Sequence, residues 1–136
     1  VQMAGAGGDP RPVVLCDCPF FAEFQALFDE KVRCLFATEL LGKGVDELMP
    51  ADMTEAISVA CQRGLVASAA DIPGVVSHQH APFRPETFEQ LPALRVVSNH
   101  GVGYGHIDSA YLRTRGVPLG FTPGAASAPT GELGAG

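Results

Sequence analysis

Residues 94–121, "LRVVSNHGVGYGHIDSAYLRTRGVPLGF", contain the pattern that decides the fold. An apolar run is followed by a glycine-rich turn, then by a segment with the apolar spacing of a helix, and then by a second apolar run at 117–121. Asp108 stands near the start of the helical segment and Gly116 just past its end, at positions that cap helices. Strands joined through a helix run parallel, so this stretch predicts a β–α–β unit with a right-handed crossover.

The same alternation of strands and helices continues upstream. Short apolar runs at 13–17, 31–37 and 74–78 are typical of strands buried in a parallel sheet. With the two runs of the stretch above, they predict an α/β fold, flavodoxin-like or Rossmann-like, in which a parallel sheet of about five strands carries helices on both faces. Ligands of such sheets bind beyond the carboxyl ends of the strands, where "SHQH" (77–80) and "HGVGYG" (100–105) are expected.

Three helices are predicted upstream of residue 94. They cover 19–30, 51–64 and 85–90. Pro19 fits the first turn of the first helix, where a missing N–H costs nothing. The apolar face of that helix is formed by Phe20, Phe24, Leu27 and Phe28. In the second helix, Asp52 can cap the start and Gly64 can end the helix in a left-handed conformation. Its apolar stripe is formed by Met53, Ala56, Ile57, Ala60 and Cys61.

The composition excludes several classes of protein. The 136 residues carry a formal charge of −6 and no basic cluster, which argues against nucleic acid or an acidic membrane as partner. No apolar run reaches the roughly 20 residues of a membrane span, and no signal peptide is recognisable. None of the four cysteines forms a C-x-x-C pair, so we expect a cytoplasmic protein with reduced thiols. The cysteines are Cys16, Cys18, Cys34 and Cys61.

The turn "HGVGYGHID" (100–108) raises the question of a phosphate-binding loop. The dinucleotide fingerprint G-x-G-x-x-G needs a third glycine where this sequence has His106, and the next strand ends in Phe121 instead of an acidic residue. The Gly-Lys-Ser/Thr of a P-loop is missing as well. Two interpretations stay open: the N–H groups of the turn bind a small anion such as a carboxylate, or the turn is merely tight and binds nothing.

Four histidines fall in two loops at the same end of the predicted sheet. They are His78, His80, His100 and His106. Because no carboxylate or cysteine stands at ligand spacing from them, we expect no metal site. They are interpreted as surface or cleft-wall residues.

Residues 91–124, "LPALRVVSNHGVGYGHIDSAYLRTRGVPLGFTPG", resemble the substrate-binding part of the D-isomer-specific 2-hydroxyacid dehydrogenases, most of all the glyoxylate/hydroxypyruvate reductase branch. The family pattern is Leu-Pro-x-Leu-Lys-x-Ile/Val, Gly-Val-Gly-x-Asp-His-Ile-Asp, a helix, Arg-Gly-Ile/Val-Pro-Val and a Thr-Pro-Gly turn. The resemblance is weaker over 125–133 and only architectural before Gly74. Gly105 replaces the family's Asp, which removes a carboxylate that would help to hold the turn or cap the helix.

The resemblance implies roles for particular residues. In the family, backbone N–H groups of this turn hold the substrate carboxylate, and the matching positions are Val102 and Gly103. Val102 also matches a position close to the nicotinamide, and Thr130 matches a position whose side chain approaches the cofactor. The loop after the third strand matches the loop that lines the substrate side, so His78 or Gln79 is expected to face the ligand.

The composition and the resemblance together predict a division into parts. Residues 1–12, rich in glycine, alanine and proline, are expected to be a disordered lead-in, 13–124 a substrate-binding α/β domain, and 125–136 the truncated start of an inter-domain helix. Since the sequence lacks an initiator methionine and stops where a helix begins, we expect a fragment. The family binds NAD or NADP mainly through a second domain, and its catalytic Arg, Glu and His would lie beyond residue 136, so no catalytic residue is expected here.

Two functions stay open. The first is part of an NAD(P)-dependent oxidoreductase that interconverts small 2-hydroxy acids and 2-keto acids. Under this hypothesis we expect the full-length relatives to be homodimers and the isolated fragment to be inactive. The second is a non-catalytic truncated relative that acts as a small-ligand-binding or interaction domain.

Overall fold

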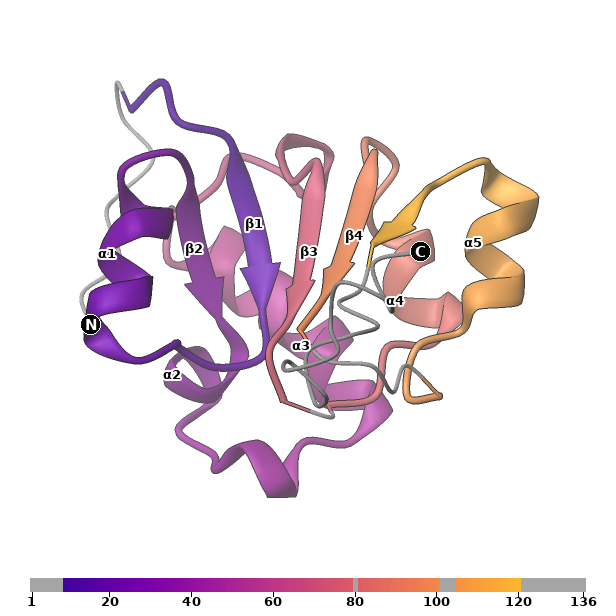
Figure 1. Ribbon diagram of the computed structural model, residues 1–136, viewed down its shortest axis with the longest axis horizontal. Coiled ribbons are helices and arrows are strands. Elements are labelled where there is room, and N and C mark those ends of the chain that lie inside the picture. Colours follow the sequence, from indigo (N-terminus) through magenta and orange to yellow (C-terminus); the bar gives the residue numbers. More distant parts are fainter. Residues whose placement is uncertain (1–8, 80, 101–104, 121–136) are drawn as a thin grey trace, which may run out of the picture.

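A computed structural model shows a sheet of five parallel strands in the order β2-β1-β3-β4-β5 (Figure 1). The strands are β1 (Val13–Cys16), β2 (Arg33–Phe36), β3 (Gly74–Ser77), β4 (Val96–Asn99) and β5 (Leu119–Gly120). The structure describes residues 9–79, 81–100 and 105–120. Each predicted apolar run contains one of these strands, so the predicted parallel α/β fold is confirmed.

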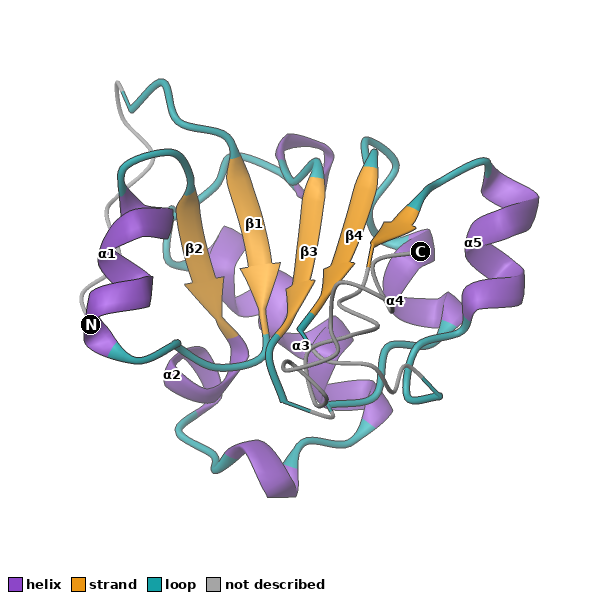
Figure 2. Cartoon of the chain, in the orientation of Figure 1, coloured by secondary structure: helices purple, strands orange, loops and turns teal. Residues whose placement is uncertain are grey.

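Helices lie on both faces of the sheet (Figure 2). They are α1 (Ala22–Asp29), α2 (Ala37–Leu41), α3 (Pro50–Gln62), α4 (Pro85–Glu89) and α5 (Ser109–Arg115), with short 3₁₀ turns at Val45–Glu47 and Ala69–Asp71. The helices predicted at 51–64 and 85–90, and the helix between Asp108 and Gly116, are confirmed as α3, α4 and α5. Helix α2 has no counterpart in the prediction, because it follows β2 without an intervening loop.

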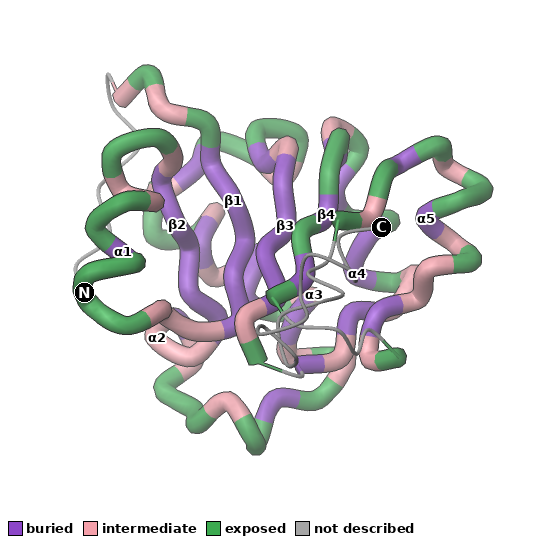
Figure 3. Tube along the Cα trace, viewed as in Figure 1, coloured by how far each residue is buried: buried purple, intermediate pink, exposed green. Residues whose placement is uncertain are grey.

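The sheet separates two apolar clusters of unequal size. All residues of the inner strands β1 and β3 are buried, and so are those of the edge strand β2 (Figure 3), as expected where helices cover the faces of a parallel sheet. Because side chains alternate across a strand, Leu15 and Val75 contribute to the larger cluster, which α2, α3, α4 and α5 cover, whereas Val14 and Val76 face α1. Among the described residues, α1 is therefore the helix that covers the smaller cluster.

Helix α1 begins later than predicted, and the side of the helix that is buried differs from the predicted apolar face. It starts at Ala22, so Pro19 lies in the preceding loop and not in the first turn. The side chain that the helix buries is Gln25, whose Oε1 accepts the Phe20 N–H at 3.1 Å and holds the loop before the helix. Two side chains of the expected apolar face stay largely exposed, Phe24 (52%) and Leu27 (61%).

The start of helix α3 is also different from the prediction. Met49 is the residue before the helix and Pro50 takes the first position, so Asp52 is not the N-cap. The Asp52 carboxylate instead accepts the Met49 N–H at 2.8 Å and a hydrogen bond from Lys43 Nζ at 2.9 Å. The Met49 N–H and the Lys43 ammonium hold the pKa of Asp52 below its ordinary value. The remaining predicted capping residues are confirmed at Gly64, Asp108 and Gly116.

We expect Gly74→Ala to destabilise the fold. A Cβ at Gly74, the first residue of the middle strand β3, would lie 2.9 Å from Val14 Cγ1, and the stiff valine side chain has little freedom to move. Overpacking of this kind costs about 1–3 kcal/mol of unfolding free energy, which urea denaturation measures.

Gly120→Ala is the matched control. Gly120 lies in the edge strand β5, and the nearest atom to an added Cβ is the Val97 carbonyl oxygen at 4.0 Å, an ordinary contact. Equal unfolding free energies for the two variants would contradict the assigned close packing of Gly74 against β1.

Candidate functional site

A polar residue stands at the carboxyl end of each of three neighbouring strands of the sheet. Asp17 directly follows β1, Ser77 is the last residue of β3, and Asn99 is the last residue of β4, and all three are buried. Because the strands are parallel, these residues lie at one edge of the sheet, where the strand arrows in Figure 1 end. A buried polar group is costly unless it is hydrogen-bonded. The bonds of these three residues therefore decide how the loops at this edge are arranged.

The carboxylate of Asp17 joins the loops that follow β1 and β3. Its Oδ1 accepts the N–H groups of Cys18 at 2.8 Å and His78 at 2.9 Å, and its Oδ2 accepts the N–H of Gln79 at 2.7 Å. Burial raises the pKa of Asp17 above its ordinary value, while the three N–H donors stabilise the charged form and act in the opposite direction. The carboxylate is thus occupied by the backbone and serves to hold the two loops together.

Ser77 and Asn99 meet the ring of His106. The Ser77 hydroxyl lies 2.9 Å from His106 Nε2 and 2.9 Å from the carbonyl oxygen of Gln79. Asn99 Oδ1 lies 3.1 Å from the same ring nitrogen. Residues 77 and 99 belong to adjacent strands, and the His106 ring bridges their ends.

His78, the expected ligand-facing residue, is half-buried beside the loop that precedes α1. Its ring is stacked on Phe20 with centroids 3.9 Å apart, and the ring of His100 lies 5.2 Å away. Its Nδ1 is 3.1 Å from the Pro19 carbonyl oxygen and 3.6 Å from Cys18 Sγ. Burial and the Asp17 carboxylate raise the pKa of Cys18 to about 12, so the thiol is protonated at neutral pH and is no activated nucleophile.

The other predicted site residues lie outside the described part of the chain. These are Val102, Gly103 and Thr130, together with His80 of the histidine group. Sequence reasoning missed Asp17, Asn99 and His106 as builders of this edge. A signal existed, because Asp17 and Asn99 are polar residues that directly end apolar runs, "VVLC" and "VVS". The pairing with His106 had no such signal, since it depends on how the chain returns to the edge.

Two kinds of feature are missing from residues 9–79, 81–100 and 105–120. No three histidine, cysteine, aspartate or glutamate side chains lie together in a way that could hold a metal ion. No helix in this part of the chain is long and apolar enough to cross a membrane.

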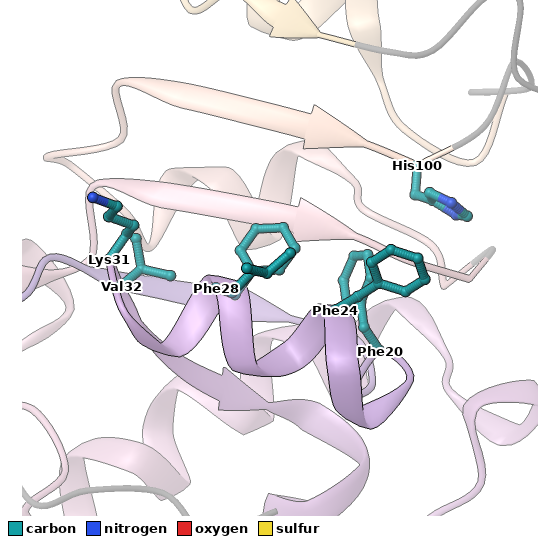
Figure 4. Close-up of a pocket in the computed structure, with 7 residues that line it drawn as sticks. Phe20, Phe24, Phe28, Lys31, Val32 and His100 are labelled. Atoms are coloured by element: carbon teal, nitrogen blue, oxygen red, sulfur yellow. The ribbon is translucent and has the colours of Figure 1, made fainter.

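The carboxyl edge of the sheet, where Asp17, Ser77 and Asn99 lie, is called the polar edge below. An apolar pocket of about 510 Å³ adjoins it (Figure 4). It is lined by Phe20, Phe24, Leu27, Phe28, Lys31, Val32 and His100. His100 stands at one end and Lys31 at the other, with the phenylalanine rings between them (Figure 4). A small hydrophilic acid has little apolar surface to bury in such a pocket.

Comparisons with known proteins agree on one family. A family model described as D-isomer specific 2-hydroxyacid dehydrogenase, catalytic domain, matches residues 30–135. A glyoxylate reductase of Korarchaeum cryptofilum (strain OPF8) is 27% identical over 106 residues, which are 76% of this chain and 32% of that protein.

Solved structures show the same fold. The 2-hydroxyacid dehydrogenase from Ketogulonicigenium vulgare Y25 superposes with a TM-score of 0.60 at 22% identity, over 92% of this chain and 38% of that one. The NADPH-dependent glyoxylate/hydroxypyruvate reductase from Sinorhizobium meliloti superposes with a TM-score of 0.53 at 20% identity, over 85% and 29%. The chain thus spans 29% to 38% of the length of these three relatives.

Asp17→Asn is expected to destabilise the protein. The substitution keeps the size of the side chain but replaces one acceptor oxygen by an NH₂ group, which would face an N–H of Cys18, His78 or Gln79. An unsatisfied buried donor costs about 1–3 kcal/mol, which is measured as a loss of unfolding free energy in urea.

Asp46→Asn is the control for this prediction. Asp46 is exposed on a short 3₁₀ turn, and its substitution should change stability by less than about 0.5 kcal/mol. If Asp17→Asn is as stable as Asp46→Asn, the Asp17 carboxylate does not hold the two loops together.

Proposed function

This chain belongs to the D-isomer specific 2-hydroxyacid dehydrogenase family, and on that premise we propose that it is the substrate-binding part of an NAD(P)-dependent oxidoreductase. The reaction proposed interconverts small 2-hydroxy acids and 2-keto acids, with glyoxylate and hydroxypyruvate as the substrate class. The observation that carries the proposal is the family match over residues 30–135, which includes the turn after β4. The glyoxylate reductase and the glyoxylate/hydroxypyruvate reductase among the relatives support the substrate class.

The proposed task of this chain is to hold the substrate carboxylate. We assign that task to the backbone N–H groups of Val102 and Gly103, since such groups attract anions without a charged side chain. In support, one described residue on either side of residues 101–104 is held at the carboxyl edge of the sheet. His100 donates its N–H to the Ser77 carbonyl oxygen at 2.8 Å, and the His106 ring lies 2.9 Å from the Ser77 hydroxyl. His78 is proposed to contribute to the substrate side from the neighbouring loop.

The nicotinamide cofactor, NAD or NADP, is proposed to be bound mainly by a part of the protein beyond this chain. The described residues do not fit the cofactor, because they contain no strand-to-helix turn with G-x-G-x-x-G spacing for its phosphates. Val102 and Thr130 are the positions proposed to approach it from this side. The cofactor supplies the hydride when it is bound. The family's catalytic Arg, Glu and His have no assigned counterpart here.

A second candidate function is a binding or interaction domain without catalysis. One observation favours it: the apolar pocket beside α1 is open, and Phe24 and Leu27 are more than half exposed on its rim. Exposed apolar patches of this kind are often docking surfaces. Turnover by a longer form of the protein would decide in favour of the dehydrogenase.

We expect the 136-residue chain to bind pyruvate or hydroxypyruvate weakly and through the carboxylate. Titration followed by ¹H–¹⁵N NMR should shift the amide signals of residues 100–107. Methyl pyruvate, which lacks the negative charge, is the matched control and should cause no shifts there. Shifts confined to other regions, or equal shifts with the ester, would contradict the assignment of the carboxylate site.

The isolated chain is also expected to show no turnover. With NADH or NADPH and glyoxylate, the loss of absorbance at 340 nm should equal that of a reaction without protein, because the acid/base and hydride-delivering parts are assigned elsewhere. Clear oxidation of either cofactor would place catalysis within these 136 residues.

A further inference from the structure

Both flanks of the turn after β4 are bonded to one residue, Ser77. On the side that enters the turn, the His100 N–H donates to the Ser77 carbonyl oxygen at 2.8 Å. On the side that leaves it, His106 Nε2 lies 2.9 Å from the Ser77 hydroxyl oxygen. Ser77 is fully buried at the end of β3, a strand paired on both sides, so it is a rigid point of attachment.

The hydrogen-bonding capacity of Ser77 fixes the direction of these bonds. The Gln79 carbonyl oxygen, 2.9 Å from the hydroxyl, can only accept, so the single hydroxyl hydrogen is donated to Gln79. The lone pairs of the same oxygen are then left to accept from the His106 ring, which requires a hydrogen on Nε2. Asn99 Oδ1, at 3.1 Å, accepts from the same N–H. The Ser77 hydroxyl, the Nε2 hydrogen of His106 and Asn99 Oδ1 each have a suitable partner in this arrangement.

The backbone beyond the turn is held from a second direction. Phe83 donates its N–H to the His106 carbonyl oxygen at 2.9 Å and accepts the Asp108 N–H at 3.0 Å. The backbone of His106 is thereby attached to the loop before α4, while its ring is attached to the end of β3. The bonds of the ring attach this segment to the carboxyl edge of the sheet.

We propose that Ser77 is a positioning residue for the carboxylate-binding turn, acting through His106. Its carbonyl oxygen fixes where the chain leaves β4, and its hydroxyl fixes the ring of the residue at which the chain returns. The inference rests on the proposed function, because it assigns Ser77 a part in ligand binding that goes beyond stability. Ser77 makes no contact with the substrate in this proposal, and it transfers no proton.

The test compares Ser77→Ala with a variant that loses a buried hydroxyl elsewhere. Thr87→Val is suitable, because Thr87 is buried in α4 and its hydroxyl bonds to Thr54 at 3.1 Å, away from the polar edge. Hydroxypyruvate affinity of the 136-residue chain is measured by NMR titration, together with Tm. Ser77→Ala should bind about fivefold to tenfold more weakly, the equivalent of one lost hydrogen bond. Thr87→Val should lose about as much Tm as Ser77→Ala does, but it should bind hydroxypyruvate as tightly as the unchanged chain.

A coupling measurement shows whether Ser77 acts through His106. His106→Ala should weaken binding to a similar degree, and Ser77→Ala should have almost no further effect in that background. Additive effects of the two substitutions, or wild-type affinity of Ser77→Ala, would overturn the proposal.

A ligand-free signal separates this proposal from the proposed function. The Nε2 hydrogen of His106 should give a slowly exchanging low-field proton resonance that keeps its position in Thr87→Val and shifts in Ser77→Ala, where Asn99 Oδ1 is the acceptor that is left. If the unchanged chain binds no keto acid, the proposed function fails and the role of Ser77 in ligand binding fails with it. If binding occurs and this resonance is the same in Ser77→Ala, the assigned bond to His106 is wrong.

Discussion

The buried carboxylate of Asp17 is the constraint on which the candidate site depends. It has no exposed surface, and three backbone N–H groups from two loops point at its two oxygens. A charged group is tolerated in such a place only because these donors replace water. The loops after β1 and β3 consequently have little freedom relative to each other. His78, which belongs to the second loop, is fixed in place by that arrangement together with its stacking on Phe20.

Buried polar groups that need a hydrogen-bonding partner also hold the chain at the end of β4. Ser77 and Asn99 are buried at the carboxyl ends of adjacent strands, and the His106 ring supplies the hydrogen-bonding partner that both need. The apolar strands fix the position of this edge, and the buried polar residues fix its loops. The edge therefore provides a rigid frame for a turn whose backbone N–H groups are proposed to bind a carboxylate.

Much of the fold could be predicted because apolar runs and capping residues are local signals. The runs at 13–17, 31–37 and 74–78, and the caps Asp108 and Gly116, lead directly to the observed elements. The prediction of α1 was less successful, since helical spacing identifies an apolar face but does not say which side the sheet covers. Gln25 is buried because it satisfies the Phe20 N–H, a tertiary contact that no spacing rule contains. The pairing of His106 with Ser77 is likewise a contact over 29 residues.

A crystal structure of the 136-residue chain with hydroxypyruvate would test the central claim most directly. The claim is that the polar carboxyl edge, and not the apolar pocket beside α1, receives the acid. We expect the ligand carboxylate within hydrogen-bond distance, about 2.7–3.2 Å, of the N–H groups of Val102 and Gly103. A carboxylate held by Lys31 in the apolar pocket, or one bound at the amino ends of the strands, would contradict it.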